Sequence, residues 1–151
     1  MTESGNASTM ATAKRVAAFA FHVTVGIRHT DLDILKNVNN VALAAIFEEA
    51  RTLYSVEYKL KGMIDPLRRV IDHLTIRFFD DGRYPGALEI SVGVASLAVD
   101  KWTLELAASQ SGKLIAVNEC TFGLLDEAGS PAPLPDALAN ILRGHLAAAP
   151  V

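Results

Sequence analysis

The stretch of this 151-residue chain that is richest in groups able to do chemistry is a polar segment, residues 28–40. It carries two carboxylates, Asp31 and Asp33, and ends with Asn39 and Asn40. The residues that follow recur at helical spacing, so the segment leads into a helix N-terminus. Backbone N–H groups at such a terminus lack intrahelical acceptors and can stabilise a developing oxyanion. A carboxylate just before it can attack a carbonyl or activate a water for attack.

The number of residues between the acid and the helix start permits a catalytic role for the acid, and it also permits a purely structural role. Asp33 precedes Asn40 by seven residues, which is enough for a loop to turn back over the helix end. The ordinary interpretation of an Asp-x-Asp pair is structural, because aspartates form turns and cap helices. Spacing alone leaves both interpretations open.

The elements that must position this segment can be predicted from hydrophobic periodicity. Apolar and polar residues alternate over residues 19–28, which is typical of a strand. Apolar residues then recur at spacings of three and four over residues 43–54, which predicts one long helix. Asn39 or Asn40 can cap this helix, because a short amide side chain accepts hydrogen bonds from free backbone N–H groups.

The rest of the chain is predicted to be mostly strand. Gly62 and Pro66 are expected to end the long helix, and four alternating stretches follow between residues 70 and 125. The links between them are short, which favours antiparallel neighbours. Residues 137–146 favour a short terminal helix. A five-stranded sheet must cover its apolar face, and the central helix is the large element available for that. The expected fold is therefore α+β, with a five-stranded antiparallel sheet wrapped round one long central helix.

Composition indicates one globular domain. Half of the residues are hydrophobic and 21% are charged, which argues against intrinsic disorder. A chain of this length forms one domain of ordinary size. Residues 1–14 are rich in serine, threonine and alanine and are expected to form a flexible N-terminal leader. Residues 15–147 are expected to form the domain.

Charge and cysteine content exclude several classes of partner. The 14 lysines and arginines do not outnumber the 17 acids, so no basic excess exists to bind a nucleic acid. The longest low-polarity run is far shorter than a membrane span, so no membrane partner is expected. The single cysteine, Cys120, cannot form an internal disulfide, and a cytoplasmic location is the default expectation. No metal-ligand cluster is visible, so no metal is expected.

A set of residues in the loop and the helix matches a known pattern: Arg28, Asp31, Asp33, Val38, Asn39, Asn40 and Phe47-Glu48-Glu49-Ala50-Arg51. It resembles the hotdog-fold acyl-CoA thioesterases of the 4-hydroxybenzoyl-CoA thioesterase type. In that family an Asp-x-Asp pair is followed by Gly-His-Val-Asn-Asn and by a helix carrying Phe-Glu-Glu-Ala-Arg. The resemblance covers about residues 19–138. It implies a hotdog fold whose central helix is the one predicted above.

The resemblance also implies roles for these residues. Asp33 would be the nucleophile or the general base, and the backbone N–H of Asn40 would donate to the thioester carbonyl. The substrate would be an acyl-CoA or acyl carrier protein thioester, which water hydrolyses to a free acid and a thiol. No cofactor is needed, because the CoA moiety is part of the substrate. The remaining expected substrate-binding residues are Lys36, Asn37, Val38, Asn39, Glu48 and Glu49.

The sequence departs from the family pattern at one place, where Lys36 and Asn37 replace Gly-His. Glycine suits a backbone with positive φ, so the left-handed conformation is expected to move to Asn37, whose side chain tolerates it better. Lys36 adds a cation that could pair with a phosphate or with Asp33. The departure keeps a second hypothesis open, a non-catalytic hotdog module that binds an acyl thioester or a protein partner. A hydratase or dehydratase ranks last, because its motif is absent.

Some charged residues outside the loop have an ordinary and a functional interpretation. Glu48 and Glu49 either assist the site or pair with Arg51 or with a partner subunit. The cations that follow the helix either form a solvated turn or contact the CoA phosphates; they are Lys59, Lys61, Arg68 and Arg69. Exposed sheet edges invite pairing. The edges therefore predict at least a twofold dimer, and the resemblance to the hotdog thioesterases, which form dimers and often dimers of dimers, implies a homodimer or a dimer of dimers.

Overall fold

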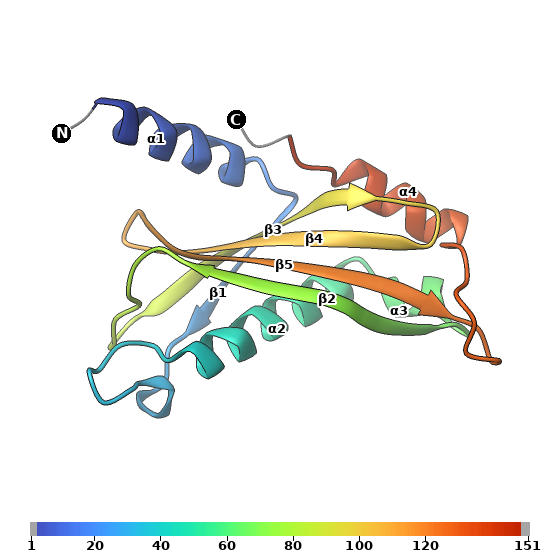
Figure 1. Cartoon of the computed structure of the whole chain (residues 1–151), viewed down its shortest axis with the longest axis horizontal. Helices are drawn as coiled ribbons and strands as arrows, with labels where there is room; N and C mark the ends of the chain where they lie inside the picture. The colour runs from blue at the N-terminus through green and yellow to red at the C-terminus, as the bar shows by residue number, and fades with distance from the viewer. Residues whose placement is uncertain (1–2, 149–151) are drawn as a thin grey trace.

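The structure, a computed structural model, describes residues 3–148 and contains one five-stranded sheet and four α-helices in that range (Figure 1). The elements in chain order are α1 (Glu3–Ala17), β1 (Phe21–Gly26), the short 3₁₀ turn η1 (His29–Asp31), α2 (Asn40–Glu57), α3 (Leu60–Ile64), β2 (Arg68–Phe78), β3 (Ala87–Leu97), β4 (Lys101–Gln110), β5 (Lys113–Leu125) and α4 (Asp136–Gly144).

The sheet has the strand order β1-β3-β4-β5-β2, and every neighbouring pair is antiparallel. Alternate residues of β3 and β4, such as Ile90 and Leu106, are buried on the face that α2 covers. Figure 1 shows α2 lying along this face while α1 lies on the opposite side of the sheet. This arrangement confirms the expected α+β hotdog fold. It leaves β1 and β2 as the two edges of the sheet.

Helix α2 forms where the hydrophobic periodicity predicted it. Leu43, Phe47, Ala50 and Tyr54 are buried against the sheet, and this stripe has the three-to-four residue spacing of one helix face. The helix is shorter than expected, because it ends at Glu57 rather than near Gly62. The break comes from Lys59, whose φ of 55° is left-handed and cannot continue an α-helix. A separate short helix, α3, follows the break.

The N-terminal segment contains more regular structure than expected. Helix α1 covers Glu3–Ala17, so the expected boundary between residues 14 and 15 falls inside a helix. The two terminal nitrogens of the Arg15 guanidinium donate to the two carboxylate oxygens of Glu105 of β4, and the Arg15 Nε donates to the Ala148 carbonyl at 2.8 Å. These contacts hold the C-terminal end of α1 in place. The Phe19 ring lies against Gly93, where an added Cβ would come within 3.0 Å of it. The flexibility of residues 1–14 stays a prediction.

The helices of the described chain do not have the dimensions of a membrane span. Within residues 3–148, no helix is both long enough and apolar enough to cross a bilayer. The cytoplasmic location stays a prediction.

Candidate active site

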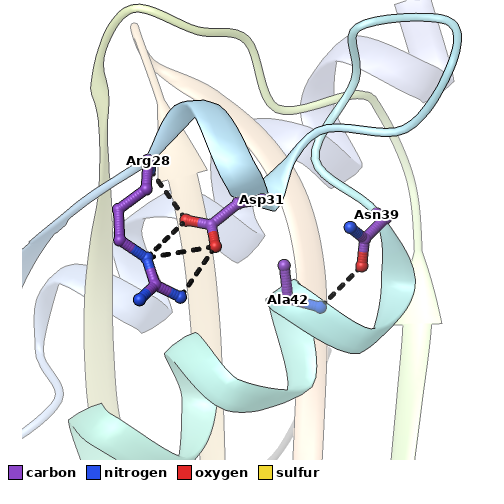
Figure 2. Close-up of polar contacts among 4 residues, drawn as sticks. All are labelled: Arg28, Asp31, Asn39 and Ala42. Atoms are coloured by element: carbon purple, nitrogen blue, oxygen red, sulfur yellow. Dashed lines mark hydrogen bonds and ion pairs between the residues drawn. The ribbon is translucent and has the colours of Figure 1, made fainter.

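The connection between β1 and α2 is fixed at both ends by one buried residue, Asp31, whose carboxylate contacts are drawn in Figure 2. Its side chain accepts hydrogen bonds from the Arg28 backbone N–H at 2.7 Å and from the Arg28 guanidinium at 2.9 Å. Its backbone carbonyl accepts from the Asn39 N–H at 2.8 Å. Asp31 therefore ties the end of β1 to the first residues of α2.

The ion pair keeps Asp31 charged. The hydrogen bond from the Arg28 guanidinium lowers the pKa of the Asp31 carboxyl below its usual range, although burial acts in the opposite direction. The same pair raises the pKa of Arg28. A carboxylate held in this way is a poor proton acceptor at neutral pH, so the first acid of the Asp-x-Asp pair has a structural role.

Asp33 occupies a different environment, because its side chain is exposed on a tight hairpin. Residues Leu32 and Val38 form the bridge that closes this hairpin, and the Asp33 N–H donates to the Asn37 carbonyl at 2.8 Å. The Asp33 Oδ1 accepts from two backbone N–H groups, those of Leu35 at 2.8 Å and Asn37 at 3.1 Å. The second oxygen has no hydrogen-bond or ion-pair partner among residues 3–148. Asp33 is thus oriented by its own loop while one carboxylate oxygen stays available.

The left-handed residue of this hairpin is Lys36, with a φ of 63°, and not Asn37 as expected. The reason lies in the backbone hydrogen bonds. The Lys36 N–H donates to the Asp33 carbonyl at 3.0 Å, while Asn37 pairs in extended fashion with Arg83. The hairpin therefore requires positive φ at position 36 whatever residue is there, at a cost of about 1–2 kcal/mol for a residue other than glycine. The expected pair between Lys36 and Asp33 is not among the ion pairs of the described residues.

The start of α2 offers free backbone donors. Asn39 is the N-cap: its side-chain oxygen accepts from the Ala42 N–H at 2.7 Å (Figure 2), and its carbonyl accepts from the Leu43 N–H at 2.9 Å. The N–H groups of Asn40 and Val41 have no acceptor within the part of the chain that the structure describes. This is the normal state of a helix N-terminus, and it leaves these two donors for a ligand.

The hairpin rests on the connection between β2 and β3. The Val38 N–H donates to the Gly82 carbonyl at 3.1 Å, and an added Cβ on Gly82 would lie 3.0 Å from the Val38 side chain. The Gln110 side chain accepts from the Arg83 N–H and donates to the Arg83 carbonyl, both at 2.9 Å. The Asp33 loop therefore lies beside the chain that leaves the end of β2. Sequence reasoning missed these supports, because they join residues far apart in the chain.

The two helix carboxylates have no partner on their own helix. Glu48 and Glu49 are exposed on α2. Arg51, with 6% of its surface exposed, donates to the Asn118 side chain of β5 at 2.6 Å instead. The expected pairing of a glutamate with Arg51 is therefore wrong for the described residues. The alternative, a contact with a partner subunit, stays a prediction.

The four cations predicted to follow the long helix come together around one open hollow of about 680 Å³, here called the basic hollow. Its lining includes Lys59, Lys61, Arg68 and Arg69, with the hydroxyl residues Thr52 and Ser55 and the acid Asp65. No ion pair involving these four cations is found in residues 3–148. Arg69 packs over the Phe122 ring at 5.0 Å, and burial lowers its pKa.

The basic hollow and the Asp33 loop lie at opposite ends of α2. The loop precedes Asn40, the first residue of the helix, and Lys59 follows its last residue, Glu57. An α-helix of 18 residues is about 27 Å long. Figure 1 shows the loop before α2 at one end of the molecule and α3 at the other. The structure therefore brings the four cations together but does not bring them to Asp33 within one chain.

The described residues contain no group of three or more histidine, cysteine, aspartate and glutamate side chains that could hold a metal ion. Cys120 is buried and free. Burial raises the pKa of its thiol, so the cysteine packs as a small apolar residue.

Comparisons with known proteins agree with the observed fold. The model of one family, described as the thioesterase-like superfamily, matches residues 27–142. No curated protein sequence matches the chain.

Similar solved structures come from several bacteria. A protein from Pseudomonas aeruginosa strain PAO1 is 22% identical, with a TM-score of 0.75 over 88% of this chain and 96% of that one. A 1,4-dihydroxy-2-naphthoyl-CoA thioesterase from Synechocystis is 17% identical, with a TM-score of 0.73 over 82% and 95%. A thioesterase from Thermus thermophilus, complexed with coenzyme A and zinc, is 23% identical, with a TM-score of 0.70 over 84% and 94%. At these identities the likeness shows the fold.

Proposed function

The chain belongs to the thioesterase-like superfamily, and from that premise we propose that it hydrolyses an acyl-CoA or acyl carrier protein thioester to a free acid and a thiol. The observation that carries this proposal is the state of Asp33. Two backbone N–H groups orient its carboxylate, and one oxygen stays free, on a hairpin that leads into the open N-terminus of α2. A carboxylate next to free helix donors is what hydrolysis of a thioester carbonyl needs.

In this proposal the chemistry is shared between the hairpin and the helix. The Asn40 N–H donates to the thioester carbonyl and stabilises the negative charge that develops on its oxygen. Asp33 either attacks the carbonyl carbon or takes a proton from the attacking water. As a base, Asp33 lets the water oxygen bond to the acyl carbon; as a nucleophile, it forms an acyl-aspartyl anhydride that water then hydrolyses, which restores the carboxylate. In both routes the C–S bond breaks and the departing thiolate takes up a proton that the water supplies. Both roles for Asp33 use the oxygen that its own loop leaves free.

The other predicted binding residues fit around this centre. Lys36, Asn37, Val38 and Asn39 form the hairpin and the helix cap, so they would border the thioester. Glu48 and Glu49 lie on the exposed face of α2, where a substrate or a partner could meet them. The basic hollow would bind the phosphates of CoA. The Thermus thermophilus structure contains coenzyme A and the Synechocystis enzyme is named for a CoA thioester, which supports CoA as the carrier.

We also propose that the active form is a homodimer or a dimer of dimers. The edge strand β2 has a free side 11 residues long. It carries exposed apolar side chains along it and just after it: Ile71 at 53%, Leu74 at 40%, Phe78 at 58% and Phe79 at 52%. A long edge that is also apolar is a site where a second chain pairs.

The proposed function is tested by the variant Asp33→Asn. Hydrolysis of a panel of acyl-CoAs, followed by detection of the free thiol, should fall about 10²–10⁴-fold, the usual contribution of a positioned acid or base. The melting temperature should change little, because asparagine can still accept the two loop hydrogen bonds. Asp126→Asn, at an exposed aspartate whose side chain accepts a hydrogen bond from the Ser130 N–H in the turn after β5, is the matched control and should keep full activity. Full activity in Asp33→Asn would overturn the proposed mechanism.

One observation favours a second candidate function, a non-catalytic module that binds an acyl thioester. The left-handed position of the hairpin holds a lysine, where the resembled family has glycine. Under this alternative CoA would raise the melting temperature of the wild-type protein, while no acyl-CoA of the panel would be hydrolysed.

A further inference from the structure

We propose that the space between α1 and the sheet is a binding site for a small amphipathic cation, an ammonium group on an apolar body. The space has a volume of about 680 Å³ and is here called the outer hollow. It lies on the face of the sheet opposite α2 (Figure 1), so the proposal does not rest on the proposed function. Its roof includes Ala13 and Val16 of α1, and its floor includes His22, Glu89, Ser91 and Ser109.

The outer hollow exists because α1 is held at one end and has short side chains along the rest. Arg15 and Phe19 fix the C-terminal end of the helix to the sheet. Ala13, half a turn earlier, lines the outer hollow and is nevertheless exposed. The floor beneath is made partly of Ser91 and Ala107, which are small as well. The resulting volume is within the range of roughly 300–1,000 Å³ that small-molecule sites have.

Polar groups gather on the floor at the side of β1 and β3. His22 of β1 lies opposite Ser91 of β3, and a hydrogen bond of 2.9 Å joins the His22 Nδ1 to the Ser91 Oγ. Glu89 is two residues before Ser91 on the same strand, so its side chain is on the same face. Ser109 of β4 lies opposite Glu89. These four side chains form one continuous polar patch.

The charge of this patch favours a cationic ligand. Glu89 has no hydrogen-bond or ion-pair partner in the part of the chain that the structure describes. The other acid in the lining, Asp80, is bound to Lys113 at 3.3 Å, and Arg15 is bound to Glu105. The outer hollow therefore has one uncompensated negative charge. An ammonium group would donate a charge-assisted hydrogen bond to it, while a carboxylate would be repelled.

The opposite side of the outer hollow is apolar and suits the body of such a ligand. Leu114 of β5 lies opposite Ser109 of β4, and Phe79 lines the same end with 52% of its surface exposed. From β1 to β5 the floor crosses three strand spacings, which is about 14 Å. Val16 of α1 covers this space from above. The lining is thus polar and acidic at one end and apolar at the other, as an elongated amphipathic amine requires.

Calorimetric titration of the wild-type protein with three probes of equal chain length tests the proposal. Octylammonium, octanol and octanoate share one apolar body and differ in the charge of the head. Octylammonium should bind at least about tenfold more tightly than octanol, which corresponds to one charge-assisted hydrogen bond. Octanoate should bind this site more weakly than octanol, because Glu89 has the same charge.

Two variants separate the role of the charge from that of the space. Glu89→Gln keeps the shape of the floor, so octylammonium should bind about tenfold more weakly while octanol is unaffected. Ala13→Phe fills the outer hollow from the roof and should abolish binding of both probes there. Glu127→Gln, at an exposed acid in the turn after β5, is the matched control and should bind octylammonium like the wild type.

Amide hydrogen exchange shows where the probe binds. Octylammonium should slow exchange in α1, because the ligand joins the helix to the sheet, and should leave the start of α2 unchanged. Slowed exchange in α2 alone would place the probe elsewhere and overturn the proposal. Equal binding of octylammonium and octanol to the wild type, full binding in Glu89→Gln or full binding in Ala13→Phe would each overturn it too. None of these measurements uses hydrolysis, so this proposal and the proposed function can fail separately.

Discussion

The two aspartates of the loop are two residues apart and have opposite environments. Asp31 is 3% exposed and is bonded to both the backbone and the guanidinium of Arg28. Asp33 is exposed, and one of its oxygens has no hydrogen-bond or ion-pair partner among residues 3–148. Solvation and hydrogen bonding decide which carboxylate can react. The pattern Asp-x-Asp therefore contains one positioning residue and one candidate catalytic residue.

At the residue scale we predict that Asp31→Asn destabilises the protein and slows catalysis. The amide would present a donor to the Arg28 guanidinium and leave a buried polar group unsatisfied, at a cost of about 1–3 kcal/mol. The link from β1 to Asn39 would loosen, so kcat should fall more than KM rises. Urea unfolding and steady-state kinetics measure the two effects. Asp31→Glu should recover part of both, and a variant with wild-type stability and kcat would refute the assigned role.

Part of the candidate site could be predicted from residue types, and part could not. The asparagine cap and the exposed acid follow from local preferences, which depend on a few neighbouring residues. The left-handed conformation at Lys36 could not be predicted, because hydrogen bonds within the hairpin impose it against the preference of lysine. The role of Asp31 could not be predicted either, since its burial depends on the packing of the whole connection.

The helices and strands also divide into those that the sequence could predict and those that it could not. The five strands and α2 were predictable because each has an apolar face with a regular period. Helix α1 has no such stripe, and what holds it is Arg15, whose partner Glu105 is 90 residues away. The end of α2 was misplaced because Lys59 breaks the helix before Gly62 is reached. An element held by the distant contacts of one residue leaves no periodic signal in the sequence.

The C-terminal segment shows how one side chain can join several elements. His145, just after α4, shares a hydrogen bond of 2.7 Å between its Nδ1 and the Tyr54 hydroxyl of α2, and its ring packs on Tyr58. Its carbonyl accepts from the Val94 N–H, and the Ala147 N–H donates to the Val94 carbonyl, so the segment pairs with β3. Burial lowers the pKa of His145 below its ordinary value of 6.5.

At the element scale this contact predicts a pH-dependent stability. The unfolded chain protonates His145 near pH 6.5, whereas the folded chain resists protonation until the pH is lower. The stabilisation is therefore complete above pH 6.5 and is lost as the pH falls below it, with a slope of at most about 1.4 kcal/mol per pH unit. Urea unfolding between pH 7.5 and about 5 measures this slope. His145→Gln should flatten it, and an equal slope in both proteins would contradict the assignment to His145.

The whole molecule has two distinct faces and one long open edge. The face of the sheet opposite α2 carries α1, while the edge strand β2 has no neighbour on its outer side. A single chain therefore leaves uncovered the surface next to which the Asp33 loop is placed. Assembly and catalysis are predicted to depend on the same strand.

At this scale we predict that Leu74→Glu converts the dimer to a monomer and removes activity together with it. Leu74 is 40% exposed near the middle of β2, so twofold pairing of two β2 edges would place two like charges near each other across the interface. Light scattering at micromolar concentration should show the mass of one chain, and hydrolysis of acyl-CoA should fall because the Asp33 loop rests on the connection that leaves this edge strand. Val99→Glu, at a residue 79% exposed in the turn between β3 and β4, is the control and should stay dimeric and active. A Leu74→Glu protein that is monomeric yet has the wild-type KM and kcat would show that the edge strand serves assembly alone, since the catalytic residues would then need nothing from a second chain.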